Sequence, residues 1–322
     1  MNLSILTIRE ATADEWDNLW KDCDYATYFQ SREWAEIWHI YSKGKICPSP
    51  QYIEFSDGKS VLLPLSYQKK FLGLVKGYLM SPAGTFGGWI SSESITFEYA
   101  HLLANYCKNQ LSNLVWRINP YEANASNIEL NNCFKKDETH VINLGVGFDE
   151  IYKNWTKGHS SAARKARKEG VLIKQASTLE DWKSYYKVYQ DSLMRWGEKA
   201  SSKYDWRLFA EMFKLKSPNI TLWLAMYREQ VVSGALIFYS NKHVVYWHGA
   251  ALKEYFHVKP VNLLMYKAIE DACEKGYSWF DFNPSGGHEG VQKFKKSFGT
   301  DSLPCPILKK DIRRSIFNFI SC

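Results

Sequence analysis

The chain has 322 residues, of which 45% are hydrophobic and 16% aromatic, and this composition excludes a disordered protein. Its 41 basic and 34 acidic side chains leave a net charge of +7, which suits RNA, a phosphate-bearing substrate or an acidic membrane surface without identifying one. The seven cysteines show no CxxC spacing and the eight histidines no HExxH spacing, so neither a disulfide framework nor a metal site is expected.

The two ends of the chain carry no membrane-spanning signal. The N-terminus lacks the basic start and long apolar core of a signal peptide, and no apolar run approaches the roughly 18 residues that span a bilayer. We interpret the cysteines as reduced thiols. Together with the absence of these signals, this predicts a cytoplasmic protein. Residues 313–320 form a short basic and apolar segment, which leaves a peripheral membrane contact open beside the more ordinary use of docking on a core.

The first half of the chain alternates strand and helix signals. Thr12 and Glu15 have the capping-box spacing that starts a helix, and Asp57-Gly58 is a strong hairpin signal. In chain order the sequence predicts a strand at 3–9, helices from 12 and at 30–41, strands at 51–55 and 61–68, a glycine-rich strand and loop at 78–90, a helix at 95–110 and a strand at 113–119.

The second half shows the same order of elements. A helix rich in cations is predicted at 160–170, with Gly170 as its C-terminal cap. The elements that follow are a strand at 171–176, a long helix from Thr178, strands at 223–228, 231–239 and 243–250, a helix at 261–274 and a strand at 277–282.

Three matches relate the two halves at nearly constant spacing. Thr12-x-x-Glu-Trp16 matches Thr178-x-x-Asp-Trp182, Trp116-Arg-Ile-Asn119-Pro120 resembles Phe280-Asp-Phe-Asn283-Pro284, and the central hairpins correspond. This repetition favours a duplicated α/β unit. We therefore predict a first domain at 1–150, a second at 151–305, and a tail at 306–322 that packs back on the first domain.

The stretch 276–299 carries the strongest functional signal. Its strand alternates Asp281 and Asn283 on a polar face with phenylalanines on a core face. It enters the turn Asn-Pro-Ser-Gly-Gly at 283–287, where the glycines allow close backbone approach to a ligand, and then a lysine cluster at 293–296. We predict a site for a polar or anionic substrate, and the alternative is a surface turn before a basic helix.

Three motifs together give the chain a family resemblance. With Phe29-Gln30-Ser31-x-x-Trp34, the basic helix 164–170, and Asp281-Phe282 leading to Phe294-Lys295-x-x-Phe298-Gly299, it resembles the FemAB-like transferases. These include the peptidoglycan interpeptide-bridge aminoacyltransferases. The resemblance implies an α/β (α+β) fold of two tandem GNAT-like domains, each with a mixed, mostly antiparallel sheet flanked by helices.

The resemblance also implies an enzyme. It would move an aminoacyl group from aminoacyl-tRNA onto an amine of a cell-envelope precursor or natural product, with no permanently bound cofactor. Two alternatives are an N-acyltransferase that uses an acyl-CoA or acyl-carrier-protein thioester, and a non-catalytic binding protein on the duplicated fold. Acetyl-CoA-binding GNAT domains hold pyrophosphate on a glycine-containing loop before a helix. The corresponding loop here, 251–262, has no glycine, which disfavours acetyl-CoA without proving tRNA.

Functional residues follow from the resemblance and from position. The resemblance places Lys295 at the acyl-transfer centre, while Asp281 would accept the amine's proton or bind its ammonium form, with a salt bridge as the ordinary alternative. The predicted substrate-binding residues are Tyr246 and His248, on one face of their strand, Asn283, Ser285, Gly286, Gly287, Glu289 and Arg195. The predicted polyanion contacts, with tRNA as the first partner and a solvated helix face as the alternative, are Lys157, His159, Arg164, Lys165, Arg167, Lys168 and Lys293.

Overall fold

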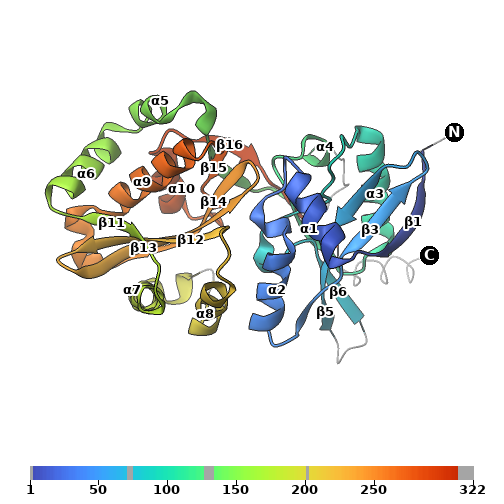
Figure 1. The fold of residues 1–322 in the computed structure, drawn as a ribbon, viewed down its shortest axis with the longest axis horizontal. Helices are drawn as coiled ribbons and strands as arrows, with labels where there is room; N and C mark the ends of the chain where they lie inside the picture. The colour runs from blue at the N-terminus through green and yellow to red at the C-terminus, as the bar shows by residue number, and fades with distance from the viewer. Residues whose placement is uncertain (1–2, 71–74, 127–133, 201–202, 311–322) are drawn as a thin grey trace, which may run out of the picture. The chain divides into compact units, whose positions relative to one another are not determined.

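The computed structural model describes residues 3–70, 75–126, 134–200 and 203–310 (Figure 1). None of the helices in these ranges is long and apolar enough to cross a membrane. The predicted strand, helix and sheet types are confirmed, with helices that flank mixed sheets made mostly of antiparallel pairs.

The chain divides into two compact units. One comprises residues 1–138 and 304–322, and the other residues 139–303, whereas the sequence places the boundaries at 150 and 305. In the tail, strand β17 (Ile307–Lys309) pairs with β8 of the first unit. Residues 311–322, which include the segment considered for a membrane contact, lie outside the described residues.

The first unit contains two sheets, with the strand orders β1-β3-β4 and β2-β5-β6-β8-β17-β9 and with β7 beside β8. Thr12 and Glu15 form the predicted capping box at the start of α1. Its elements besides β17 are β1 (Ile5–Glu10), α1 (Ala13–Asp22), a 3-10 turn (Tyr28–Gln30), α2 (Arg32–Tyr41), β2 (Ile46–Pro48), β3 (Gln51–Phe55), β4 (Ser60–Leu63), β5 (Ser66–Lys70), β6 (Val75–Leu79), β7 (Phe86–Gly87), α3 (Phe97–Gln110), β8 (Val115–Ile118), α4 (Ala123–Ser126) and β9 (Phe134–Lys135).

One predicted strand of the first unit is two strands. Residues 61–68 are divided into β4 and β5, which belong to different sheets. Pro64 lies between them, and proline has no N–H to donate to a sheet ladder. The prediction of a single strand was wrong because it ran through this residue.

The second unit is built on one sheet of order β11-β12-β13-β14-β15-β10-β16, in which β14 and β15 run parallel and the pairs β11–β12, β12–β13, β13–β14 and β10–β15 run antiparallel. Its elements are β10 (Glu138–Asn143), α5 (Phe148–Lys153), α6 (Lys157–Lys168), β11 (Leu172–Gln175), α7 (Leu179–Trp196), α8 (Trp206–Leu215), β12 (Ile220–Tyr227), β13 (Gln230–Ser240), β14 (His243–Ala251), a 3-10 helix (Lys253–Val258), α9 (Pro260–Glu274), β15 (Trp279–Asp281), α10 (Glu289–Lys296) and β16 (Asp301–Pro304).

Helices cover both faces of this sheet. In Figure 1, α7 and α8 lie on one face and α6, α9 and α10 on the other. The main core of the unit lies on the second side, where buried residues of α6 and α9 meet the strands and Phe298. On the first side, Tyr185 of α7 packs against Phe209 of α8 and the β13 backbone at Gly234.

Gly234 is required by this packing, and its replacement by alanine is expected to lower the free energy of unfolding by about 2–3 kcal/mol. A Cβ at this position would lie 2.4 Å from Tyr185 Cδ2 and 3.0 Å from the Trp223 carbonyl oxygen. Tyr185 is fully buried, so it has no space into which to retreat. Urea unfolding measures the change. Gly158→Ala on α6, where a Cβ meets nothing within 4 Å, is the matched control and should not destabilise the protein. Equal stability of the two variants would contradict this account.

Candidate functional site

The end of β15 brings the two predicted catalytic residues to one turn. Asp281 pairs with Val141 of β10 and Val245 of β14 and is fully buried, so the predicted polar strand face is not open to solvent. Its Oδ1 accepts hydrogen bonds from the Thr139 hydroxyl and from the backbone N of Asn283, the latter at 2.6 Å. The carboxylate therefore fixes the start of the turn.

Lys295 approaches the same turn from α10. Its side chain is 3% exposed, and its Nζ donates a hydrogen bond to the carbonyl oxygen of Asn283. Asn283 has φ +61, a left-handed conformation that asparagine tolerates better than most residues. The backbone of Asn283 thus bonds to both predicted catalytic side chains, through its N–H to Asp281 and through its carbonyl to Lys295.

Aromatic packing holds α10 in place. Phe298, just beyond the helix, is fully buried, with its ring 4.7 Å from that of Trp155 and 5.2 Å from that of Phe282. Phe294 packs edge-on against Phe298 at 4.9 Å. These contacts explain the Phe-Lys-x-x-Phe spacing, because they place the Lys295 face of the helix toward the turn.

The glycines of the turn have the predicted conformations. Gly286 and Gly287 have φ of +60 and +87, and the His288 backbone N donates to the Ser285 carbonyl at 3.1 Å. Ser285 is buried, whereas Glu289, in the first turn of α10, is exposed. Ser285 thus lies within the turn and Glu289 at its outer side.

The prediction that Tyr246 and His248 share a strand face was wrong. The register between β13 and β14 shifts there, so that Ile237 pairs with Tyr246 while Leu236 pairs with His248. An extra residue of this kind, a β-bulge at Trp247, reverses the alternation of side chains. Tyr246 packs on the core beside Phe282, and His248 lies on the α7 side.

His248 and Arg195 have structural partners. The Nδ1 of His248 lies 2.6 Å from the Tyr185 hydroxyl, and burial lowers the pKa of His248 to about 3, so the imidazole is neutral at physiological pH. Arg195 Nη1 donates to the Ala251 carbonyl at 3.2 Å, and the guanidinium stacks over Phe256 at 5.2 Å. Arg195 thereby joins the end of α7 to the end of β14.

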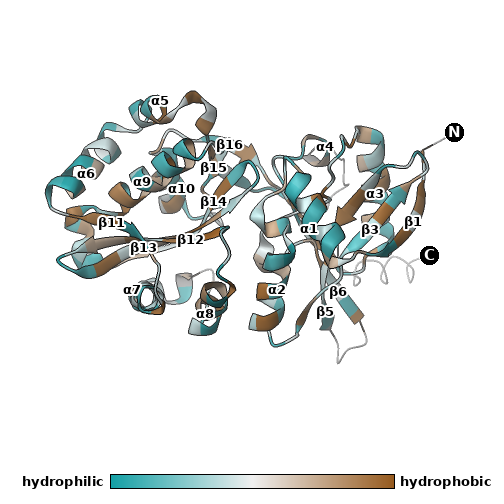
Figure 2. Ribbon diagram, viewed as in Figure 1, coloured by the Kyte–Doolittle hydropathy of each residue, from teal (hydrophilic) through white to brown (hydrophobic). Residues whose placement is uncertain are grey.

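The predicted cationic helix is α6, and Figure 2 shows it largely in hydrophilic colours. Only Ala163 and Ala166 are buried along it, and the cations face solvent. No ion pair of α6 is found within the part of the chain that the structure describes, although Arg167 lies over the Tyr266 ring at 5.0 Å. The exposed cations predicted as polyanion contacts are Lys157, Arg164, Lys165, Arg167, Lys168 and, on α10, Lys293.

His159 differs from the other members of this set. It is half-buried, its Nδ1 lies 3.0 Å from Asn262 Nδ2, and its ring packs against Phe294 and Phe298 at 5.6 and 5.0 Å. Burial, and then the nearby Lys259 charge, lower its pKa. His159 therefore connects the first turn of α6 to the helix that carries Lys295.

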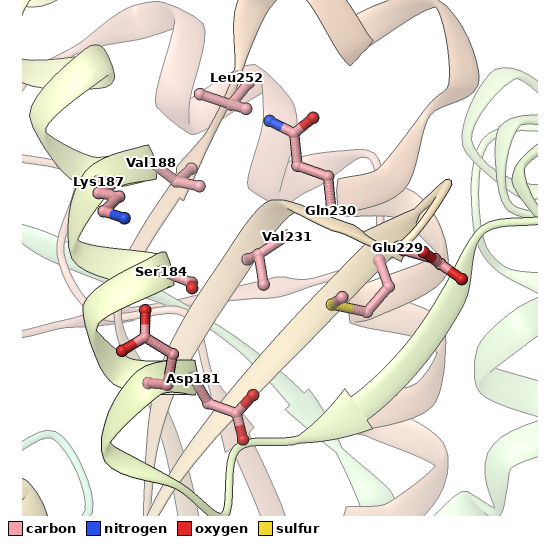
Figure 3. A pocket seen from close by; sticks show the side chains of 10 residues that line it. Asp181, Ser184, Lys187, Val188, Glu229, Gln230, Val231 and Leu252 are labelled. Atoms are coloured by element: carbon pink, nitrogen blue, oxygen red, sulfur yellow. The ribbon is translucent and has the colours of Figure 1, made fainter.

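A cavity of about 560 Å³ lies between the first turns of α7 and the β12–β13 hairpin (Figure 3). Its Asp181 is engaged by Lys174 at 2.7 Å and by the backbone N of Thr178 at 3.2 Å, in the predicted capping box. Because α7 covers the sheet face opposite α10, this cavity is separate from the Lys295 turn.

The corresponding turn of the first unit is closed by its own side chains. The Asn119 amide donates to the Tyr25 carbonyl at 2.8 Å and to Gln30 Oε1 at 3.1 Å, and its Oδ1 accepts from the Tyr121 backbone N at 3.1 Å. Gln30, from the Phe-Gln-Ser motif, is fully buried. The sequence predicts no counterpart of Lys295 in the first half. In the structure, the hydrogen bonds of Asn119 with Tyr25, Gln30 and Tyr121 fill the turn after β8.

Glu122 ends this turn and is expected to make stability depend on pH. Burial raises its pKa to about 7 from 4.5, although the N–H groups of Ala125 and Asn124 oppose the rise. Folding therefore favours the protonated form of Glu122. The contribution of this carboxyl group to the free energy of unfolding is complete below pH 4.5 and is lost as the pH rises to about 7. We expect the free energy of unfolding to fall by about 2–3 kcal/mol across this window, and Glu122→Gln to remove most of that fall. An unchanged pH profile in urea unfolding of Glu122→Gln would contradict the prediction.

One site residue was missed by sequence reasoning. Thr139 lies on β10, which was not predicted, although the β-branched residues between 138 and 143 are a usable strand signal. The hydrogen bond from the Thr139 hydroxyl to Asp281 joins residues 142 positions apart in the sequence, so no local pattern indicates it.

Known proteins share this fold. Residues 156–296 match the acetyltransferase (GNAT) domain family, and no curated protein sequence matches the chain. The crystal structure of FemX is 14% identical with a TM-score of 0.75, over 98% of this chain and 100% of that one. L-PGS from Bacillus licheniformis is 12% identical with a TM-score of 0.58, over 94% of this chain and 93% of that one. A conserved protein from Bacteroides thetaiotaomicron is 11% identical with a TM-score of 0.60, over 94% and 99%.

The matched domain and the similar structures test the predicted FemAB-like resemblance. The matched GNAT domain, residues 156–296, includes α6, the loop 251–262 and the Lys295 turn. The likeness in fold extends over nearly all of FemX and of this chain. The predicted fold is confirmed, because the chain contains a match to the acetyltransferase (GNAT) domain family and shares the fold of FemX over nearly its whole length.

Proposed function

We propose that this acyltransferase moves an aminoacyl group from aminoacyl-tRNA onto a substrate amine at the Lys295 turn. The observation that carries the proposal is the buried ammonium of Lys295, held on the Asn283 carbonyl at the end of β15. Burying a charged group is costly unless it is paired and hydrogen-bonded, and the Asn283 carbonyl provides one such bond to Lys295. A cation fixed in this way suits a reaction in which negative charge develops on an acyl oxygen.

The proposed reaction is an aminolysis. The amine nitrogen attacks the carbonyl carbon of the aminoacyl ester, a C–N bond forms, and the C–O bond to the terminal ribose of the tRNA breaks. The ribose oxygen takes up the proton that the amine nitrogen loses. Lys295 donates a hydrogen bond to the carbonyl oxygen as it becomes negative. Much of the acceleration comes from holding the two reactants in position.

We assign Asp281 a positioning role in this reaction. Its carboxylate is held by Thr139 and holds the backbone of Asn283, which in turn receives Lys295. Acceptance of the amine's proton by Asp281 stays a prediction, as do substrate contacts by Gly286, Gly287 and Glu289.

The surface of α6 supports tRNA as the donor. Its cations face solvent along a helix of 12 residues, about 18 Å long, and its first turn contacts α10 through His159 and Phe294. A polyanion bound along α6 would therefore reach the helix that carries Lys295. A helix that inserts into a bilayer presents large apolar side chains, whereas the apolar side of α6 consists of buried alanines.

A thioester donor is the second candidate, favoured by the acetyltransferase description of the matched domain. The start of α9 weighs against CoA. Lys259 precedes the helix with φ +57, Pro260 at the first helical position has no N–H, and the Asn262 N–H donates to the Lys259 carbonyl at 3.2 Å. The free backbone amides that would hold a pyrophosphate are correspondingly fewer.

A transfer assay tests the proposal. Bulk tRNA charged with labelled amino acids is incubated with the protein and glycinamide, a simple amine, beside parallel reactions with labelled acetyl-CoA. We expect label to move from tRNA to glycinamide in proportion to enzyme. Transfer from acetyl-CoA and none from tRNA would contradict the proposal. Cytoplasmic location, the absence of a bound cofactor and the natural acceptor stay predictions beside it.

A further inference from the structure

The cavity between α7 and the β12–β13 hairpin has no part in the proposed transfer (Figure 3). Its volume of about 560 Å³ is within the range of about 300–1,000 Å³ that is typical of pockets for small molecules. Met226 and Val231 of the hairpin and Val188 of α7 give it apolar surface, while charged and polar side chains line the rest. The placement of these polar groups indicates what the cavity can bind.

Opposite charges lie along the α7 wall. Glu180 and Asp181 are in the first turn of the helix, and Lys187 follows Asp181 by six residues, about 9 Å along the helix axis. Ser184 lies between Asp181 and Lys187. Lys187 is exposed, and among the described residues its ammonium is found in no ion pair. The carboxylate of Glu180 is also exposed, and its ion pair with Lys183 is long, at 3.7 Å.

The hairpin wall adds an oriented amide. Gln230 Oε1 accepts a hydrogen bond from the Tyr255 hydroxyl at 2.9 Å, which directs the NH₂ group of the same amide elsewhere. In Figure 3 this nitrogen points toward Leu252, at the same end of the cavity as Lys187. Glu229, the preceding residue, adds a carboxylate to the lining. The cavity therefore has N–H donors and a positive charge at one end, and carboxylates of the first turn of α7 at the other.

We propose that this cavity binds a short peptide with both termini free, about three residues long. The peptide carboxylate contacts Lys187 and the Gln230 amide, and the peptide ammonium contacts the first turn of α7, where Glu180 lies. Three residues of extended chain span about 10 Å, which matches the separation of the two ends. The apolar surface of Met226 and Val231 faces the part of the peptide between its termini. Binding here does not depend on the proposed aminoacyl transfer.

Calorimetric titration of the full chain with triglycine and three analogues tests the proposal. Triglycinamide lacks the carboxylate, N-acetyltriglycine lacks the ammonium, and glycine has both charges but cannot span the two ends. At about pH 6.5 both termini of triglycine are charged. We expect saturable binding of triglycine, and binding at least tenfold weaker for each analogue, because each loses the charge-assisted hydrogen bonds of one end. No saturable binding of triglycine, or equal affinity for any of the three analogues, would overturn the proposal.

Lys187→Met assigns the carboxylate end. It should weaken triglycine binding about fivefold and leave triglycinamide binding unchanged, because triglycinamide has no carboxylate for Lys187 to contact. Since Lys187 is exposed, the Tm should not change. Lys214→Met removes the same charge from α8, away from the cavity, and should alter neither affinity. Equal effects of the two substitutions on triglycine, or a loss of triglycinamide binding as large as that of triglycine in Lys187→Met, would contradict the proposed orientation and the site.

Discussion

Replacing Lys295 by methionine is expected to lower the rate of aminoacyl transfer by about 10²- to 10³-fold, the usual effect of removing a group that stabilises a developing oxyanion. Methionine keeps the length and the apolar stem of the side chain and removes the ammonium that bonds to Asn283. The substitution leaves the Asn283 carbonyl without this donor, so we expect the free energy of unfolding to fall by about 1–3 kcal/mol. Single-turnover transfer from charged tRNA to glycinamide, together with urea unfolding, measures the two quantities.

Lys296→Met is the control for this substitution. Lys296 is the next residue of α10 and is exposed, so its replacement removes the same charge from the surface. Its transfer rate should remain within about twofold of the native rate. If Lys295→Met folds normally and transfers as fast as Lys296→Met, the acyl-transfer centre does not lie at this turn.

Replacing Arg164, Lys165 and Lys168 together by glutamine is expected to weaken tRNA binding by about 100-fold at 0.1 M salt. Each phosphate contact on a nucleic acid contributes about 0.7–0.9 to the slope of log affinity against log salt. The three cations are exposed on α6, and none is found in an ion pair among the described residues. The slope should therefore decrease by about 2–3, as filter binding across a salt series would measure.

A triple variant of equal charge separates contact from net charge. Lys153, Lys183 and Lys214 are exposed and paired with neighbouring glutamates at 3.2, 3.7 and 2.8 Å. Their replacement by glutamine changes the net charge by the same amount and should leave the salt slope nearly unchanged. Equal losses in the two triple variants would mean that net charge alone attracts tRNA. Loss of binding to anionic vesicles, with tRNA binding intact, would assign α6 to a membrane instead.

Local signals in the sequence predicted much of this fold. The capping boxes at Thr12 and Thr178 and the duplicated strand ends at Asn119 and Asn283 depend on neighbouring residues, and the structure contains all of them. The Phe-Lys-x-x-Phe motif indicates which face of α10 packs, because Phe294 and Phe298 are four residues apart and therefore lie on the same side of the helix. The burial of Lys295 was not predicted.

Features that depend on distant pairing could not be predicted in this way. The alternation rule placed Tyr246 and His248 together, and it failed because a bulge at Trp247 is set by the register with β13. The burial of Asp281 depends on β10 and β14 on either side of it. The absence of a hydrogen-bond partner for Asn283 Oδ1 and Ser285 Oγ among the described residues depends on every neighbouring group.

The position of a bound acyl donor tests the central claim most directly. A crystal structure with 3′-aminoacylamino-3′-deoxyadenosine, which replaces the reactive ester by a stable amide, locates the acyl group. We predict that its amide carbonyl oxygen lies within hydrogen-bond distance of Lys295 Nζ. An analogue bound elsewhere, with Lys295 out of reach of its carbonyl oxygen, would contradict the account.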